Sequence, residues 1–464
     1  MNSKERRQSK HTSPVIVLLG ILLLATALTY VVESGRYERE GGLVVPGSYQ
    51  VIEKNQSLEN IVRVGGDEAT GEAYPVSLIG AVMAIPTGLE RMAGLIFMVL
   101  IIGGMFGIMS DSGAIDAGLE RLLSSVHGNI YILVPILMIV FGAGSTFLGL
   151  ASEYLLVIPL MVVMANRLGL SNVIGLAIVT VAVKAGYLSS VTNPIPLSIA
   201  QPLVGLQIFS GAMFRLVSFL IFLTVGIVFV LFQIRRERRG SSDVHEIEHT
   251  PLSTRHTLVL LILAIGVVFL VYGSNHWHWN HHELSAYYIF LSMLLAAAAG
   301  LKPSEAADSF VGGMKKILMA SMLIGVASAV AVTLEQGRIL DSIVHGLTGL
   351  IGQDNSSISA IGMFGSQLLL DFLIPSTSGQ AAVSMPILGP LGQLSGVEPQ
   401  TTVLAFLFGN GITNMLTPTS GTLLAYLATA QVGWAEWARF IVWLWAIFIA
   451  IAIVLLIIAV RIGY

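Results

Sequence analysis

Two short stretches decide the fold of this chain: GYLSSVTNP at residues 186–194 and NGITNMLTP at residues 410–418. Each stretch follows a long apolar run, is rich in Ser, Thr and Asn, and ends in a proline, which has no backbone N–H to donate. Lipid offers no hydrogen-bond partner to the backbone groups that such a break sets free. We therefore predict two interrupted helices whose polar turns face an interior site.

The composition of the chain is that of a membrane protein. Of its 464 residues, 55% are hydrophobic and 11% are charged, and the mean hydropathy is +0.81, whereas soluble domains carry about 25% charged residues. The absence of cysteine excludes a disulfide framework, and the net charge of -3 gives no reason to expect a nucleic-acid partner. The sequence predicts an all-α polytopic membrane protein.

The apolar runs differ in length, and the short ones are informative. The first run, at residues 14–32, exceeds the roughly 7 to 15 residues of a signal-peptide core, so we expect it to stay as a helix. The paired runs within residues 129–165 and 358–394 are shorter than the roughly 20 residues that a full span needs. Each of these two pairs is predicted to form a re-entrant hairpin.

The chain also repeats itself. At an offset of 224 residues, Pro194 pairs with Pro418 and Arg215 pairs with Arg439, so one fold unit is predicted to occur twice. The predicted divisions are an N-terminal helix with an external loop at 1–74, a first repeat at 75–239, a linker with two extra helices at 240–299, and a second repeat at 300–464.

Charge predicts the orientation of the two units. The basic N-terminus and the basic linker RRERRG at residues 235–240 should both be cytoplasmic. The first unit then starts outside and ends inside, whereas the second unit starts inside. We therefore expect inverted-topology repeats in a bacterial cytoplasmic (inner) membrane, with the N-terminus inside and the C-terminus outside.

Inverted repeats with interrupted helices are typical of secondary transporters, which bind substrate and coupling ions near the bilayer midplane. Freed carbonyls and Ser, Thr and Asn oxygens can replace the hydration shell of Na+, and a half-helix N-terminus can attract a carboxylate. The alternative is a proline kink whose Ser and Thr side chains bond back to their own helix. The predicted Na+ ligands at the breaks and hairpin tips are Ser145, Thr146, Ser190, Thr192, Asn193, Asn410, Thr413 and Asn414.

Three ionisable residues fall within predicted membrane segments or turns: Glu153, Lys184 and Asp371. Each costs several kcal/mol there unless it is paired or solvated, so each is a functional candidate. We interpret Glu153 as a candidate substrate ligand, and Lys184 and Asp371 as membrane charges. A structural ion pair between Lys184 and Glu153 is the alternative.

The region LDFLIPSTSGQAAVSMPILGPLGQLSGVEPQTTVLAFLFGNGITNMLTPTSG, at residues 370–421, resembles the anaerobic C4-dicarboxylate carrier family, in particular its YfcC-like branch within the ion transporter superfamily. TNPIPLSIAQ at residues 192–201 resembles that family too, and the likeness extends over nearly the whole chain. The resemblance implies scaffold and transport domains, an elevator-like motion and a homodimer.

The resemblance also implies roles for individual residues. Two departures bear on ion coupling, because YfcC-like chains commonly carry a pair of acids where this chain has Ser152 and Glu153, and an aspartate where it has Asn410. Positions that bind substrate or Na+ in related carriers match Asn193, Pro194, Ser376, Thr377, Ser378, Asn414, Thr417 and Pro418.

The expected substrate is a small carboxylate-bearing metabolite, and an amino acid is favoured over a dicarboxylate. A dicarboxylate would bring two negative charges beside Glu153 and Asp371, whereas the amine of an amino acid could pair with an acid. Na+ is the expected coupling ion. A proton-coupled carrier, a basic amino-acid exchanger and an ion channel remain as rival hypotheses.

Enzymatic chemistry is not expected from this sequence. HWHWNHHE at residues 276–283 offers four histidines, but their spacing fits no ordered zinc motif, and the tryptophans are typical of membrane-interface anchors. We therefore predict no catalytic residues, no bound metal and no cofactor apart from Na+. The expected partners are the small-molecule substrate, the lipid bilayer and a second copy of the chain.

Overall fold

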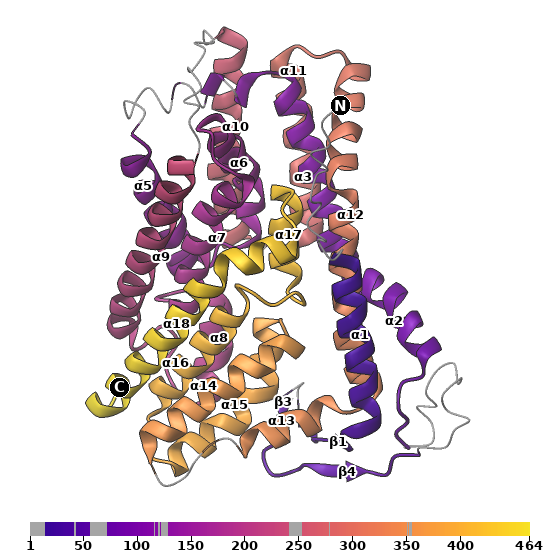
Figure 1. The fold of residues 1–464 in the computed structure, drawn as a ribbon, viewed down its shortest axis with the longest axis vertical. Helices are drawn as coiled ribbons and strands as arrows, with labels where there is room; N and C mark the ends of the chain where they lie inside the picture. Colours follow the sequence, from indigo (N-terminus) through magenta and orange to yellow (C-terminus); the bar gives the residue numbers. More distant parts are fainter. Residues whose placement is uncertain are drawn as a thin grey trace, which may run out of the picture.

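The computed structural model is built almost entirely of helices (Figure 1). It describes residues 14–40, 43–55, 72–115, 117–118, 121, 129–240, 253–277, 279–349, 351 and 355–464. The helices of the first half are α1 (Pro14–Val31), α2 (Leu78–Arg91), α3 (Ala93–Asp111), α5 (Ile130–Leu148), the 3-10 helix η3 (Ser152–Leu156), α6 (Ile158–Arg167), α7 (Asn172–Ser189), α8 (Pro194–Leu203) and α9 (Ala212–Gly240). Those that follow are α10 (Thr254–His276), α11 (His281–Ala299), α12 (Pro303–Gln336), α13 (Leu340–Thr348), α14 (Ser356–Leu373), α15 (Thr377–Leu394), α16 (Pro399–Thr413), α17 (Gly421–Ala430) and α18 (Trp434–Ile462).

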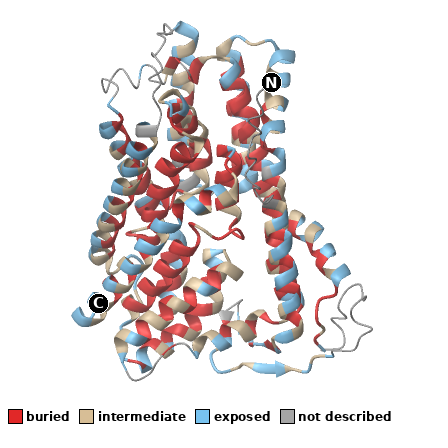
Figure 2. Cartoon of the chain, in the orientation of Figure 1, coloured by how far each residue is buried: buried red, intermediate tan, exposed pale blue. Residues whose placement is uncertain are grey.

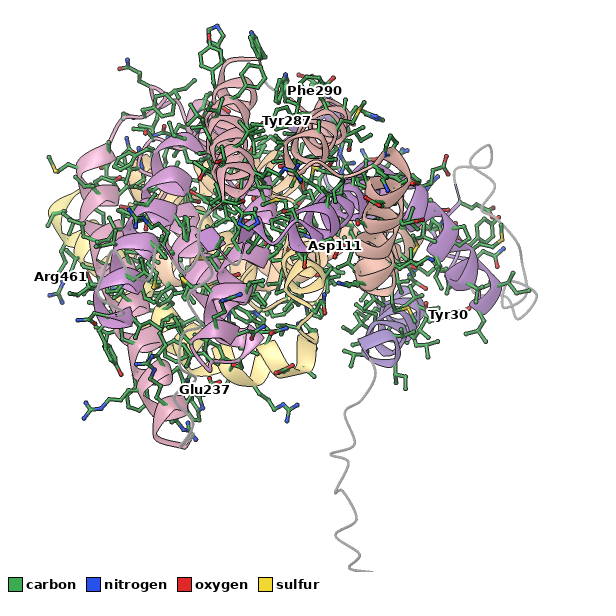
Figure 3. The ribbon with its side chains drawn as sticks, turned by 90° about the horizontal axis from the view of Figure 1, so that it is seen from above. Tyr30, Asp111, Glu237, Tyr287, Phe290 and Arg461 are labelled. Atoms are coloured by element: carbon green, nitrogen blue, oxygen red, sulfur yellow. The ribbon has the colours of Figure 1, made fainter. Side chains whose placement is uncertain are left out.

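The prediction of a polytopic membrane protein is confirmed. Eight of the described helices are long and apolar enough to cross a bilayer. Their outward faces carry apolar side chains, among them Met213 of α9 and Trp443 of α18, which are mostly exposed. Seen from above, Phe290 lies at the rim of the molecule (Figure 3). Apolar surface on this scale is suited to lipid and not to water.

The helices form two bundles. One contains α1, α2, α3, α10, α11 and α12, and the other contains α5 to α9 and α14 to α18 (Figure 1). Helix α17 contacts α3 and α12, and η3 contacts α3, so these two elements join the bundles. The arrangement brings the region around the second break against the first bundle.

Small residues allow close helix packing in the first bundle. A Cβ on Gly313 of α12 would lie 2.1 Å from the Gly103 carbonyl oxygen of α3, and a Cβ on Gly107 would lie 2.1 Å from the Ser309 carbonyl oxygen. Backbones can approach this closely only where side chains are absent, as is common where membrane helices cross. Helices α3 and α12 are therefore held backbone to backbone.

Both predicted helix interruptions are present. Helix α7 ends at Ser189, Ser190 has the left-handed φ of 42°, and α8 begins at Pro194. Helix α16 ends at Thr413, and α17 begins at Gly421. The half-helices α8 and α17 each have 10 residues, and α9 and α18 each have 29. These equal lengths fit a repeated unit, while the inverted orientation and the re-entrant hairpins stay predictions.

Helix α7 forms the centre of the second bundle. In an 18-residue apolar window of the span that contains α7 and α8, 94% of the residues are buried, against 33% in such a window of α18 at the edge (Figure 2). Helix α7 packs against α5, α6, α9 and α16. A residue on α7 can therefore reach side chains from both halves of the chain.

The prediction of an all-α chain left out one small feature. Four short strands form two antiparallel pairs: β1 (Ser34–Arg36) with β4 (Gln50–Ile52), and β2 (Arg39–Glu40) with β3 (Leu43–Val44). They lie in the segment predicted as an external loop. Polar residues alternate too irregularly there for strands to be read from the sequence, and the strands also contact helices, β1 with α13 and β3 with α15.

Candidate functional site

A buried carboxylate lies beside the second helix break. Asp371, near the end of α14, is completely buried, and two amides of α16 and its C-terminal turn donate to it. The Nδ2 of Asn410 lies 2.6 Å from Asp371 Oδ1, and the Nδ2 of Asn414 lies 3.0 and 3.2 Å from its two oxygens. These hydrogen bonds stabilise a charge that would otherwise be costly in an apolar interior.

Asn414 also connects this acid to a buried cation. Its Oδ1 accepts from the Nζ of Lys184 on α7 at 3.4 Å and from the Oγ of Ser420 at 2.6 Å. The amide of Asn414 therefore lies between the ammonium and the carboxylate. Lys184 donates to Asn414 and forms no ion pair with Glu153 among the described residues, so the alternative of a structural Lys184–Glu153 pair is wrong.

The polar network continues from Asn410 into the second hairpin. Asn410 Oδ1 accepts from Thr377 Oγ1 at 2.9 Å, and Tyr187 of α7 donates to Thr377 at 3.1 Å. On the other side, Asn410 Nδ2 donates to Gln380 Oε1 at 2.8 Å, and Gln380 donates to Gln367 Oε1 at 2.8 Å. These side chains join α7, α14, α15 and α16 in one buried network.

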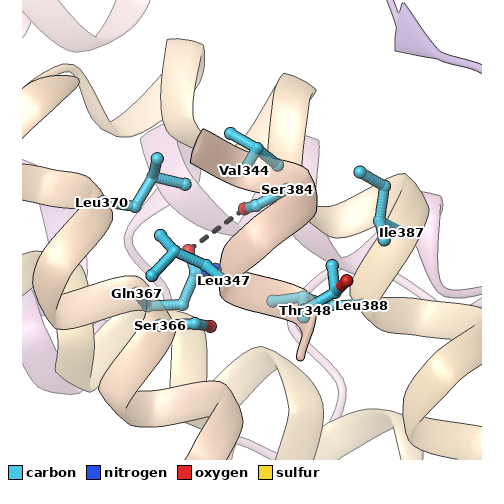
Figure 4. A pocket seen from close by; sticks show the side chains of 9 residues that line it. All are labelled: Val344, Leu347, Thr348, Ser366, Gln367, Leu370, Ser384, Ile387 and Leu388. Atoms are coloured by element: carbon cyan, nitrogen blue, oxygen red, sulfur yellow. Dashed lines mark hydrogen bonds between the residues drawn. The ribbon is translucent and has the colours of Figure 1, made fainter. Parts of the chain in front are cut away.

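The network ends at a small cavity of ≈ 10 Å³ beneath α13 (Figure 4). Ser384 donates to Gln367 at 3.0 Å on the wall of this cavity. Its other lining residues are mostly apolar, including Val344 and Leu388. The space suffices for about one water molecule and for no metabolite.

Helices α15 and α17 both begin at this site, and the backbone N–H groups of their first two residues do not donate to the capping side chain. Ser376 caps α15 by accepting from Gly379 N, and Ser420 caps α17 by accepting from Leu423 N. In the described part of the chain, the N–H groups at the first two positions of each helix make no other hydrogen bond. An N-terminus of this kind favours an anion.

The first break is built differently. Thr146 on α5 accepts from Val191 N at 3.0 Å, and Thr192 donates to the Phe147 carbonyl at 3.1 Å, so the break is tied to the end of α5. The carbonyl of Ser190 accepts from Arg215 Nε at 3.1 Å, and that of Val191 from Arg215 Nη2 at 3.2 Å. A guanidinium therefore occupies the carbonyl end of α7.

The N-terminus of α8 does not offer the donors that the sequence predicted for a half-helix. Pro194 and Pro196, at its first and third positions, have no N–H. The N–H of Ile195 between them donates to Asn193 Oδ1 at 3.0 Å. The expectation that a half-helix N-terminus can attract a carboxylate therefore fails for α8 and stays a prediction for α17.

Two buried polar atoms near the first break have no hydrogen-bond partner among the described residues: Ser145 Oγ and Asn193 Nδ2. Both residues are fully buried. A buried group without a partner costs free energy, and it often marks a place that a water molecule, an ion or a ligand occupies. The amide of Asn193 could donate to such a ligand.

Glu153 lies in η3, away from Lys184. Its Oε2 accepts from Ala151 N at 2.8 Å, and Tyr426 of α17 donates to the Ala151 carbonyl. Tyr154, next in the chain, donates to the Phe141 carbonyl at 2.7 Å. The first hairpin tip is thus fastened to α17, and Glu153 lies near the junction of the two bundles.

The remaining predicted site residues surround these clusters. Thr413 donates to the Leu368 carbonyl at 3.0 Å, and Thr417 shares a 2.7 Å contact with Thr419. Ser376 and Ser378 are exposed at the second tip. Pro418 lies in the turn that follows α16. The structure therefore brings five of the predicted residues together: Asp371, Lys184, Asn410, Asn414 and Thr377. Ser190 and Thr192 lie apart from this group. The binding roles of all these residues stay predictions.

The model of the protein family described as "DcuC: C4-dicarboxylate anaerobic carrier" matches residues 12–461. The chain belongs to this carrier family. It is 27% identical over 482 residues to the "Putative basic amino acid antiporter YfcC" of Escherichia coli (strain K12), with 94% of each chain covered. It is 23% identical to an uncharacterized protein of Haemophilus influenzae, with 95% of each covered.

Two solved transporter structures are similar to this carrier. The YdaH transporter of Alcanivorax borkumensis has 14% identity and a TM-score of 0.44, with 98% of this chain and 99% of that chain covered. MtrF of Neisseria gonorrhoeae has 16% identity and a TM-score of 0.44, with 97% and 95% covered.

Several residues of the candidate site were not assigned a role from the sequence. Tyr187, Gln367 and Ser420 take part in the network, and Arg215 entered only as one half of a repeat pair. Polar residues within apolar helices were the available signal. Their partners lie on helices far away in sequence, so the contacts could not be read from spacing.

Proposed function

We propose that this protein is a secondary active transporter that moves a small carboxylate-bearing metabolite, with an amino acid favoured over a dicarboxylate. The observation that supports it is the buried arrangement of Lys184, Asn414 and Asp371 beside the second break. An acid and a base joined by one amide can each change partner when a ligand arrives. Buried charges of this kind within membrane helices typically belong to transport pathways.

The charge of this site favours an amino acid. The N-termini of α15 and α17 and the ammonium of Lys184 suit one carboxylate, while Asp371 suits an amine. A dicarboxylate would place a second negative charge near Asp371 with no further cation among the site residues. The exchange of basic amino acids is the second candidate, because the YfcC relative carries that name and Glu153 offers a second acid.

Na+ coupling and an elevator-type movement belong to the same proposal. Asn410, Thr413 and Thr377 present amide and hydroxyl oxygens beside Asp371, which is a donor set suited to Na+. The division into two bundles that meet at α17 and η3 supports movement of one bundle against the other. We further propose the inner membrane as the location and a homodimer as the assembly.

Reconstituted proteoliposomes test the proposal. Vesicles that carry the purified protein are loaded with unlabelled substrate, and counterflow of radiolabelled glutamate, serine, leucine, lysine, arginine, succinate and fumarate is measured with Na+ or choline outside. We expect saturable uptake of one amino-acid class that requires Na+. Uptake of lysine or arginine only against internal basic amino acid, without Na+, would establish the exchanger instead.

A proton-coupled carrier, a dicarboxylate carrier and a channel would each give a different result in the same vesicles. Uptake that follows an imposed pH gradient and ignores Na+ indicates proton coupling. Saturable uptake restricted to succinate or fumarate contradicts the amino-acid preference, and a sustained current without saturation indicates a channel. The Asp371→Asn variant serves as the control, because its folded protein should lose uptake in every transporter arm.

A further inference from the structure

Arg215 is an arginine at the start of α9 that is only 1% exposed, and no carboxylate within the described ranges pairs with it. Its partners are four oxygen atoms. Besides the carbonyls of Ser190 and Val191, these are Gln400 Oε1 at 3.4 Å and the hydroxyl of Tyr464 at 3.3 Å, both from Nη1. A buried guanidinium without an acid must draw its stabilisation from such dipoles.

These four oxygens lie where a cation would bind favourably. The carbonyls of Ser190, which is the C-cap of α7, and of Val191 directly follow the helix, where the negative end of its dipole lies, and Ser190 has the left-handed conformation. A break in a membrane helix can present carbonyls to Na+ in this way. Here the guanidinium already fills that place.

We propose that Arg215 is a built-in cation at the first helix break, which positions Ser190 and Val191 and keeps a mobile cation from binding to their carbonyls. The inference rests on the proposed transport function, because it assigns where a coupling ion does not bind. It also divides the predicted Na+ ligands into two groups. The backbone carbonyl of Ser190 is bonded by Arg215, whereas the oxygens of Asn410 and Thr413 at the second break stay available to Na+. The Oδ1 of Asn414 already accepts from Lys184 and Ser420.

The neighbours of Arg215 show why the place is rigid. Gln400 also donates to Ser210 Oγ at 2.7 Å, and Tyr464 donates to the Gly211 carbonyl at 2.7 Å and stacks on Phe214. The loop before α9, the start of α16 and the end of α18 thus form one wall around the guanidinium. Removing the side chain would leave the four oxygens facing a space of guanidinium size.

The Arg215→Ala variant tests this assignment. We expect its uptake to fall about tenfold, because several charge-assisted hydrogen bonds are lost. Millimolar ethylguanidinium should then raise its melting temperature in a saturable way and restore part of its uptake. Wild type should show neither response. The matched control is Arg439→Ala, since the repeat pairs Arg439 with Arg215 but Arg439 is exposed and bonds the Ala435 carbonyl of its own helix.

Binding and transport are read separately, so the inference and the proposed function can fail independently. Wild type without uptake of any tested compound overturns the transport proposal and leaves the melting-temperature result valid. An Arg215→Ala protein with wild-type uptake, or one that is impaired and not stabilised by ethylguanidinium, overturns the built-in cation. If that variant does not fold, Arg215→Lys and Arg215→Gln replace it. Retained uptake in the lysine variant alone supports the role of charge, and equal uptake in both overturns it.

Discussion

At the first helix break, the carbonyls of Ser190 and Val191 face the guanidinium of Arg215, whereas at the second break Asn414 lies between Asp371 and Lys184. The half-helix after the first break has proline at its first and third positions, and the N–H between them already donates to Asn193. The half-helix after the second begins with Gly421 and is capped by Ser420. Two similar sequences thus both interrupt a helix, but with a left-handed C-cap at Ser190, a right-handed one at Asn414, and different chemistry.

The interruption of a helix and the binding chemistry at that interruption therefore depend on different residues. A proline and a run of Ser, Thr and Asn suffice to interrupt a helix, and both halves of the chain have them. The side chains that face each break come from other helices: α9 supplies Arg215, while α14 and α7 supply Asp371 and Lys184. The repeated sequence therefore accounts for the interruption of both helices, and the different neighbouring side chains give the two breaks different chemistry.

The first prediction should give the clearest difference, and it tests whether the two repeats, each with its own break, lie in opposite orientations in the membrane. Because the chain has no cysteine, single cysteines can be introduced without a background. Arg238→Cys, at the end of α9, should react with an impermeant maleimide only after the membrane is opened. Gly463→Cys, at the end of α18, should react in intact cells. Labelling of both from the same side contradicts the inverted repeat and leaves the breaks comparable in sequence only.

The same substitution at both breaks separates a site from a cap. Asn414→Ala removes bonds to Asp371, Lys184 and Ser420, and leaves two buried charges without their bridge, so we expect a loss of about 3 kcal/mol in the free energy of unfolding. Asn193→Ala removes the cap of α8 and should cost about 1 kcal/mol.

Denaturant unfolding of the purified variants in detergent measures both values, and uptake is recorded in parallel. Uptake should disappear in the Asn414 variant. Equal losses of stability at the two breaks would show that they contribute alike and would contradict the asymmetry.

A double-mutant cycle sharpens the account of the second break. Asp371→Asn leaves Lys184 buried without its acid, and Lys184→Met leaves Asp371 without its base. The double variant removes both charges. We expect a coupling free energy of about 1 to 3 kcal/mol, as is found for groups within one network. Unfolding midpoints of the four proteins give this value, and additive losses would mean that Asn414 separates the two charges instead of joining them.

Much of the fold could be predicted from the sequence. The predicted apolar runs and the two short paired segments correspond to described helices, and the two predicted breaks lie between described helices. They could be predicted because hydrophobicity and proline act locally. Helix α13 and the four strands were not predicted. Helix α13 is short and amphipathic, and the strands are two or three residues long, so both depend on packing.

The candidate site could be predicted only in part. Asp371 and Lys184 were selected because charges are costly in lipid, and Asn414 because it lies in a helix break, but 230 residues separate Lys184 from Asn414, and no local pattern joins them. The missing donors of α8 could have been read from TNPIP, since proline has no N–H whatever the fold. The contact of Arg215 with the first break required the tertiary structure.

The smallest change in stability is expected for a substitution at Tyr37, which lies in a region remote from both breaks. This variant gives a baseline for the variants at the two breaks. Burial and the nearby Asp341 carboxylate raise the pKa of Tyr37 to about 12, and its hydroxyl contacts His345 Nδ1 at 3.1 Å. Below pH 10 this phenol is protonated in both the folded and the unfolded chain, so its contribution to stability is constant. Between pH 10 and 12 the unfolded chain loses the proton first, so stability falls as the pH rises.

Tyr37→Phe should therefore be less stable than wild type by about 1 kcal/mol at pH 8, because it lacks the hydrogen bond to His345. This deficit should shrink by about 1 kcal/mol as the pH approaches 11, because phenylalanine does not titrate. Unfolding midpoints across pH 8 to 11 measure the difference. Uptake should be unchanged, since the substitution touches neither break. A deficit that stays constant with pH contradicts the raised pKa, and a loss of uptake would mean that the strands near α13 act on the site.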